Sequence, residues 1–167
     1  MSVIYALATP AVRSAICIFR VSGKGCHNHV SEIFGLDNPQ PKSFLLCDLK
    51  NNGTFIDRVG LILFKGPESY TGEDSFEVYA HGSLGIMSLI VDLFDGRGFD
   101  QASPGEFTKR AFINDKISLN EAESLSDFIE SASSQEVFLS GASLFGDLSK
   151  KLSDFSERIN SLRVSVE

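Results

Sequence analysis

An acidic residue inside an apolar strand pattern is the first candidate for chemistry in this chain. Glu77 lies in the segment Ser75–Tyr79, where apolar and polar side chains alternate. Strand alternation places Glu77 and Tyr79 on one face and the apolar residues on the other. In the plainest interpretation the polar face of a hairpin strand meets water. Alternatively, Glu77 faces a cavity and accepts hydrogen bonds from a ring NH and an amino group of a bound heterocycle.

A second candidate is Arg20, which stands at the end of an apolar run just before Ser22-Gly23. Residues 15–21 are expected to form a strand buried on both faces. One interpretation is a strand-end arginine whose stem packs on the sheet while its head reaches water. The other is a guanidinium aimed at a carboxylate, either of a ligand or of a neighbouring side chain that positions the ligand.

Three further cations, Lys109, Arg110 and Lys116, lie close together in a segment expected to form a short helix over 106–116. Their clustering is typical of a solvated helix face. The same clustering is compatible with a local basic surface. The formal net charge of −7, however, argues against general binding to a phosphate backbone.

The histidines and cysteines give no metal or nucleophile pattern. His27 and His29 are two residues apart on an expected helix, so they point to different faces and are expected to be solvated. His81, expected in a turn before a helix, is interpreted as a structural hydrogen-bonding residue. Cys17 and Cys47 fall in apolar strand patterns and are expected to be buried. We therefore expect no catalytic residue and no metal site.

The localisation expected from the sequence is cytoplasmic. The chain has 3 cysteines with no CxxC spacing, and its start lacks a basic leader followed by a clean apolar centre. No segment approaches the roughly 20 apolar residues of a membrane span, so no membrane association is expected.

The order of expected elements predicts an α+β domain with a mixed or antiparallel sheet and packed helices. An Asn51-Asn52-Gly53 turn between two apolar segments is a hairpin signal. Strands are expected over 3–8, 15–21, 43–49, 57–64, 75–79 and 99–102, and helices over 24–34, 83–94 and 106–116.

The character of the chain changes near residue 117, which divides it into an expected domain over 1–117 and the start of a helical domain over 118–167. Helices are expected over 118–133 and from Ser134 to the end, where the chain is expected to be cut in mid-helix. The second helix carries a heptad-like apolar seam that requires a partner helix from missing sequence or another chain. The seam consists of Phe145, Leu148, Leu152, Phe155, Ile159, Leu162 and Val166.

Four segments carry a resemblance to a known family. ALATP, AICIFRVSG, GPESYTGEDSFEVYAHGS and SPGEFTKRAFINDKISLNEAESLSDFIESASS occur in this order. They resemble the N-terminal region of the tRNA modification GTPase family TrmE, also called MnmE, over essentially the whole chain. The resemblance implies a tetrahydrofolate-binding type of fold that forms a homodimer and binds 5-formyl-tetrahydrofolate or a related tetrahydrofolate, followed by a helical domain.

The family also implies a wider context. Its intact members work with the flavin-dependent protein GidA, or MnmG, to add an aminomethyl or carboxymethylaminomethyl group to the wobble uridine of tRNA. They bind GTP with Mg²⁺ and K⁺ through a separate G domain. This chain contains no GxxxxGK[ST] phosphate loop. We therefore expect that this polypeptide alone does not hydrolyse GTP.

The family's folate contacts, carried over by motif position, fall on Arg20 in FRVSG, Glu77 in FEVYAHG and Lys116 in FINDK. A pterin offers adjacent donors that suit Glu77, and the two cations can meet carbonyl, formyl or glutamate oxygens. The chain departs from the family in two loops, with TPAVRS in place of TPPGRG and AHGS in place of GHGG. Two other functions remain open: a free-standing folate-dependent aminomethyltransferase-like enzyme, and an assembly module whose pocket has decayed.

Overall fold

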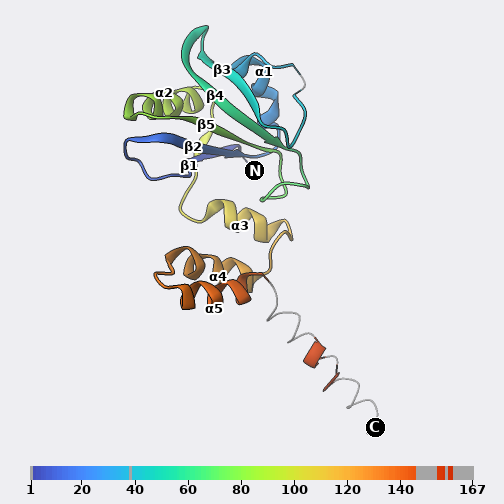
Figure 1. Ribbon diagram of the computed structural model, residues 1–167. Helices are drawn as coiled ribbons and strands as arrows, with labels where there is room; N and C mark the ends of the chain where they lie inside the picture. The colour runs from blue at the N-terminus through green and yellow to red at the C-terminus, as the bar shows by residue number, and fades with distance from the viewer. Residues whose placement is uncertain (1, 38, 146–153, 157, 160–167) are drawn as a thin grey trace. The chain divides into compact units, whose positions relative to one another are not determined.

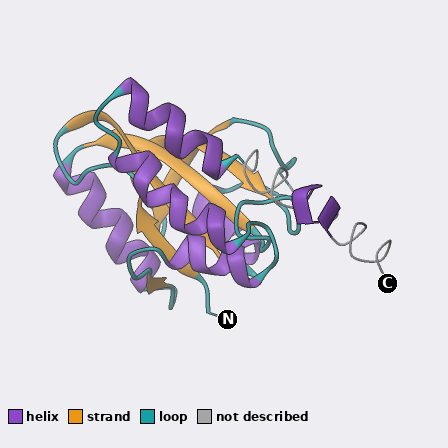
Figure 2. Cartoon of the chain, turned by 90° about the horizontal axis from the view of Figure 1, so that it is seen from below, coloured by secondary structure: helices purple, strands orange, loops and turns teal. Residues whose placement is uncertain are grey.

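The computed structural model describes residues 2–37, 39–145, 154–156 and 158–159 (Figure 1). It divides into two compact units, residues 1–114 and 115–167. Helices and strands are both well represented (Figure 2), which confirms the expected α+β class.

The first unit is built on a six-stranded sheet in the order β3-β4-β5-β2-β1-β6. All neighbouring strands are antiparallel except β1 and β6, which are parallel. The β3–β4 hairpin turns at Asn52 and Gly53, both with positive φ, as the Asn-Gly signal predicted. The strands are β1 Ile4–Leu7, β2 Ser14–Ser22, β3 Leu45–Asn51, β4 Thr54–Phe64, β5 Ser75–Gly82 and β6 Asp100–Gln101.

One face of this sheet is covered by helices α1, Val30–Phe34, and α2, Leu84–Asp95 (Figure 1). The helix expected over 24–34 is divided, because a 3-10 turn at Cys26–His29 follows the left-handed Gly25 and only then does α1 begin. A further helix, α3, Glu106–Ile113, follows β6 and is shorter than expected.

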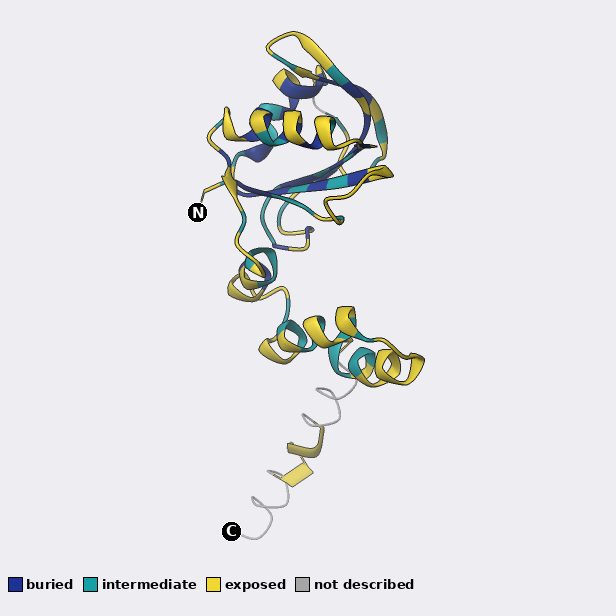
Figure 3. Cartoon of the chain, turned by 90° about the vertical axis from the view of Figure 1, so that its left-hand side faces the viewer, coloured by how far each residue is buried: buried dark blue, intermediate teal, exposed yellow. Residues whose placement is uncertain are grey.

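The hydrophobic core lies between the sheet and these two helices. Alternate residues of the central strands point into it, including Phe19, Leu61 and Val78, and all three are fully buried. Phe94 of α2 packs against the rings of four other aromatic core residues, Tyr5, Phe19, Phe76 and Phe99. Figure 3 shows the outward side of α2 exposed, while the strands beneath it are largely buried. Cys17 and Cys47 are buried, as predicted.

The second face of the sheet carries the polar residues of the central strands. The prediction that residues 15–21 are buried on both faces is wrong, since Ile16 is 58% exposed and Ile18 and Arg20 are half-buried. The alternation that buries Cys17, Phe19 and Val21 turns their neighbours toward this other face. We call it the open face.

The histidines are less exposed than predicted. His27 lies 2.9 Å from the Ser75 carbonyl through Nε2, and the His29 ring packs edge-on against Phe99. The expectation that both are solvated is therefore wrong, because the 3-10 turn holds them against the core. His81 lies in β5, which extends to Gly82, rather than in a turn. Its hydrogen bond to Asp57 agrees with the predicted structural role.

The second unit contains α4, Leu119–Glu130, and α5, Ser134–Leu144, which pack against each other. Each begins with a capping box, formed by Ser118 with Glu121 and by Ser133 with Glu136. The helix expected from residue 134 to the end is interrupted, since α5 ends at Leu144. Four of the predicted seam positions, Leu148, Leu152, Leu162 and Val166, lie outside the described residues. Among the described helices, none is long and apolar enough to cross a bilayer.

Candidate functional site

Arg20 and Glu77 meet on the open face. They are directly paired residues of β2 and β5. Arg20 Nε donates a hydrogen bond to Glu77 Oε1 over 2.9 Å, and Arg20 Nη2 lies at the same distance from this oxygen as an ion-pair contact. The Glu77 side chain is 15% exposed and that of Arg20 38%, so the pair is partly shielded from water. A charge-assisted contact of this kind fixes the orientation of both side chains.

Tyr79 is a second hydrogen-bond donor to Glu77. Its hydroxyl donates to Glu77 Oε2 over 2.8 Å from the same face of β5. Burial raises the pKa of Tyr79, and the hydrogen bond to the Glu77 carboxylate raises it further. Each carboxylate oxygen accepts about two hydrogen bonds. Among the described residues, Oε1 thus accepts a hydrogen bond from Arg20 and Oε2 accepts one from Tyr79.

Two aromatic rings flank the Arg20 guanidinium. Its Cζ atom lies 5.6 Å from the centre of the Tyr70 ring and 5.8 Å from that of Phe107, both within the range of cation–π attraction. Tyr70 comes from the loop between β4 and β5, and Phe107 from α3. The Tyr70 hydroxyl lies 3.1 Å from the hydroxyl of Thr108, which joins the two segments.

A third ring, Phe44, contacts Tyr79. It packs edge-on against Tyr79 at a centroid distance of 5.6 Å. It also lies directly on Gly60 of β4, where an added Cβ atom would overlap its Cζ and Cε atoms. Gly60 pairs with Tyr79 across the strands. The absence of a side chain at Gly60 therefore allows Phe44 to reach Tyr79.

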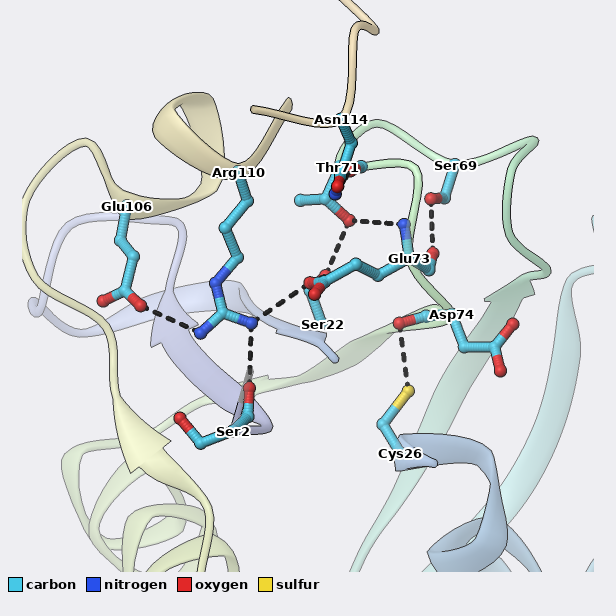
Figure 4. Close-up of polar contacts among 10 residues, drawn as sticks. All are labelled: Ser2, Ser22, Cys26, Ser69, Thr71, Glu73, Asp74, Glu106, Arg110 and Asn114. Atoms are coloured by element: carbon cyan, nitrogen blue, oxygen red, sulfur yellow. Dashed lines mark hydrogen bonds and ion pairs between the residues drawn. The ribbon is translucent and has the colours of Figure 1, made fainter. Parts of the chain in front are cut away.

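A buried polar network anchors the loop that carries Tyr70 (Figure 4). The Arg110 side chain is only 5% exposed and contacts Glu73 and Glu106. The prediction of a solvated face or basic patch is therefore wrong for Arg110, which lies on the side of α3 that turns toward the sheet. The positive charge is compensated by these two carboxylates.

The two loops that depart from the family motifs lie side by side. Ser14 pairs with Gly82 at the edge of β2 and β5, and His81 lies next to them. His81 Nδ1 lies 2.8 Å from Asp57 Oδ1, and the His81 backbone N–H donates to Asp57 Oδ2. A shallow hollow of about 450 Å³ adjoins them, lined also by Arg13, Ser83 and the start of α2. Within the described part of the chain, no group of three metal-ligating side chains is present.

The structure thus brings together two of the three residues selected from the sequence. Lys116 belongs to the second unit, and its approach to Arg20 and Glu77 stays a prediction. Sequence reasoning missed Tyr79, Tyr70, Phe107 and Phe44 as neighbours of the pair. Strand alternation had already placed Tyr79 on the face of Glu77. The other three come from distant segments, and their proximity had no local signal.

Comparison with known proteins agrees with the motifs. Residues 3–116 match the family model described as GTP-binding protein TrmE N-terminus. The chain therefore belongs to this family.

Curated relatives share about two fifths of their aligned residues with this chain. A protein named tRNA modification GTPase MnmE from Legionella pneumophila (strain Corby) is 39% identical over 98% of this chain. Proteins of the same name from Maricaulis maris and Nitrosococcus oceani are 36% and 38% identical over 98% of it. The chain spans 37%, 38% and 36% of the length of these three relatives, a little over a third.

Proposed function

We propose that this chain is the folate-binding, dimer-forming part of a tRNA modification GTPase, and that Arg20 and Glu77 bind 5-formyl-tetrahydrofolate or a related tetrahydrofolate. The observation that carries the proposal is the partly shielded Arg20–Glu77–Tyr79 group on the open face, bordered by three aromatic rings. It combines aromatic side chains with a few fixed polar groups, which is the composition that small-molecule sites share.

The chemistry of a reduced pterin fits this group. A pterin edge carries an amino group next to a ring NH, and a carboxylate oxygen that already accepts one hydrogen bond, as each Glu77 oxygen does, has capacity for a second donor. The guanidinium has five N–H donors, of which one is hydrogen-bonded to Glu77, so others can meet a carbonyl or formyl oxygen. Lys116 is proposed as the third contact on the strength of its motif.

The open face also supports the proposed homodimer. Leu46, which pairs with Gly60 on β4, is 74% exposed, and neighbouring Phe44 is 58% exposed. Large apolar side chains that gather next to a binding group mark interaction surfaces more often than isolated ones do. A second copy of the chain would shield these side chains and the folate group. Sedimentation of the wild type and Leu46→Asp would test this, with a shift to monomer expected in the variant.

The family and its relatives support a proposal about the wider role. We propose that the parent protein hydrolyses GTP with Mg²⁺ and K⁺ and acts in the cytoplasm with the flavin-dependent GidA/MnmG to modify the wobble uridine of tRNA. This chain holds no phosphate loop motif, and on this proposal GTP turnover requires a part of the parent protein that this chain does not contain. Purified chain is expected to release no phosphate from GTP above a buffer blank.

Titration calorimetry with 5-formyl-tetrahydrofolate tests the proposal. We expect saturable heat of binding with the folate and no heat with p-aminobenzoylglutamate, which lacks the pterin ring. This result would support a site that recognises the pterin ring. A second candidate is an assembly module without ligand, favoured by the fact that both Glu77 oxygens already accept hydrogen bonds. Dimer formation with no heat from the folate would support this second candidate and contradict the first.

A further inference from the structure

One buried guanidinium joins three segments that are distant in sequence. Arg110 Nη1 donates to the Ser2 carbonyl over 2.8 Å and lies 3.1 Å from Glu73 Oε2. Arg110 Nη2 donates to Glu106 Oε1 over 2.9 Å. Figure 4 shows the guanidinium between these groups, with Glu106 on one side and Glu73 on the other. The N-terminal segment, the β4–β5 loop and the first turn of α3 are thus held together by a single side chain.

The contact with Glu73 extends into the loop and the sheet. Ser22 of β2 donates to Glu73 Oε2 over 3.0 Å and lies 2.6 Å from the Thr71 hydroxyl. Asn114, just after α3, donates from its side chain to the Thr71 carbonyl over 2.7 Å. Thr71 is 1% exposed. The loop is therefore attached at Thr71 and at Glu73. Its attachments to α3 come from Arg110 in the last turn and from Asn114 just after the helix.

These two segments supply the rings on Arg20. Tyr70 precedes Thr71 in the loop, and Phe107 follows Glu106 in α3. We propose that Arg110 is a positioning residue of the Arg20–Glu77 site. By joining the loop to α3, it holds the Tyr70 and Phe107 rings against the Arg20 guanidinium. Both rings are therefore in position before a ligand binds. The part of this proposal that concerns ligand affinity rests on the proposed folate function.

The fork shape of arginine is what this role requires. Two nitrogens of Arg110 make three contacts in two directions, toward Glu73 and Ser2 on one side and toward Glu106 on the other. A lysine ammonium keeps the positive charge but presents its donors from one point. Arg110→Lys should therefore keep most of the charge compensation while loosening the link between the loop and α3.

A fluorescent reporter separates positioning from simple folding. The chain has no tryptophan, so Phe107→Trp introduces a single reporter beside Arg20. In this background Arg110→Lys is expected to shift the emission to longer wavelength and lower its anisotropy, with no ligand present. A Phe55→Trp reporter at the start of β4 should not change. Arg58→Lys, the same substitution in an exposed ion pair with Asp48, is the matched control and should leave the Phe107→Trp signal unchanged.

The effect on ligand affinity is measured with protein that carries no introduced tryptophan. Arg110→Lys should weaken 5-formyl-tetrahydrofolate binding by about tenfold, while Arg58→Lys binds like the wild type. If Arg110→Lys loses its circular dichroism signal, Glu73→Gln replaces it, because the amide keeps the shape and removes the charge that attracts Arg110. This variant should shift the reporter in the same direction.

Two outcomes would overturn the positioning role. One is an unchanged Phe107→Trp signal in folded Arg110→Lys or Glu73→Gln. The other is a signal change of equal size at the Phe55→Trp reporter, which would indicate general loosening. Absence of folate binding in the wild type would instead contradict the proposed function, and the ligand-free reporter would still decide the role of Arg110.

Discussion

Arg20 and Glu77 are 57 positions apart in the chain, yet they face each other as directly paired residues of β2 and β5. Two nitrogens of Arg20 contact one oxygen of Glu77, and Tyr79 contacts the other. The register of two antiparallel strands alone brings the pair together. A slip of either strand by one residue would turn that strand's side chain from the open face toward the hydrophobic core and so separate the pair.

Glu77→Ala is expected to weaken folate binding by more than about 1.5 kcal/mol, which is the scale of a hydrogen bond to a charged group. The substitution removes the only acceptor on which Arg20 and Tyr79 converge. Titration calorimetry of the folded variant provides the measurement. Asp48→Ala removes a carboxylate from an exposed ion pair on β3 and should bind like the wild type. Equal affinity in the wild type and Glu77→Ala would remove Glu77 from the site.

Gly60→Ala is expected to destabilise the first unit by about 1–3 kcal/mol, the usual cost of overpacking. The new methyl group would occupy the space of the Phe44 ring, which lies directly on the β4 backbone. Urea unfolding measures the change. Gly85→Ala, where the added atom meets Ser83 Oγ at an ordinary 3.7 Å, is the matched control and should cost little. Combining Gly60→Ala with Phe44→Ala should restore part of the loss. If the double variant loses as much stability as Gly60→Ala alone, or more, overlap with the Phe44 ring does not cause the destabilisation.

Tyr5→Phe is expected to reduce the decline of stability at alkaline pH. Burial raises the pKa of Tyr5, and its hydrogen bond to Asp95, with a length of 2.6 Å, raises it further. Because the pKa of Tyr5 is raised in the folded state, protonated Tyr5 stabilises the fold fully at pH values below its ordinary pKa of about 10. This stabilisation is lost as the pH rises above that value.

Urea unfolding of the wild type and Tyr5→Phe at several pH values between about 8 and 11 tests this expectation. At the lower pH the variant should be less stable by about 1 kcal/mol, because it lacks the hydrogen bond. The difference should narrow as the pH rises. Tyr79, whose pKa is also raised, remains in the variant, so the decline should lessen rather than disappear. A constant difference across the range would contradict the assignment to Tyr5.

Ser118→Ala is expected to cost about 1 kcal/mol in the second unit. The Ser118 hydroxyl accepts from the Glu121 backbone N–H over 3.2 Å, and the Ser118 N–H donates to the Glu121 carboxylate over 2.7 Å. Thermal unfolding followed by helical circular dichroism measures the effect. Ser126→Ala in the same helix removes only a long 3.4 Å side-chain contact and should be neutral or slightly stabilising. Equal melting temperatures of Ser118→Ala and Ser126→Ala would argue against a stabilising N-cap at Ser118.

The sequence by itself determined the elements whose signals are local. Alternation in 75–79 identified the strand and its buried face, Asn52-Gly53 identified the hairpin, and apolar periodicity identified α2. The motifs identified the family and singled out Arg20 and Glu77. Each of these depends on neighbours within one strand, turn or helix, and local order is enough to express it.

Only the tertiary structure decided which distant groups meet. Arg110 was expected to be solvated because a cation on a short helix usually is, but a carboxylate 37 positions away made its burial possible. Phe44 reaches Tyr79 because Gly60, on the strand between them, has no side chain. Such contacts depend on strand register and on the packing of α3 and the loop onto the sheet. These are set by the whole fold at once, and no local pattern encodes them.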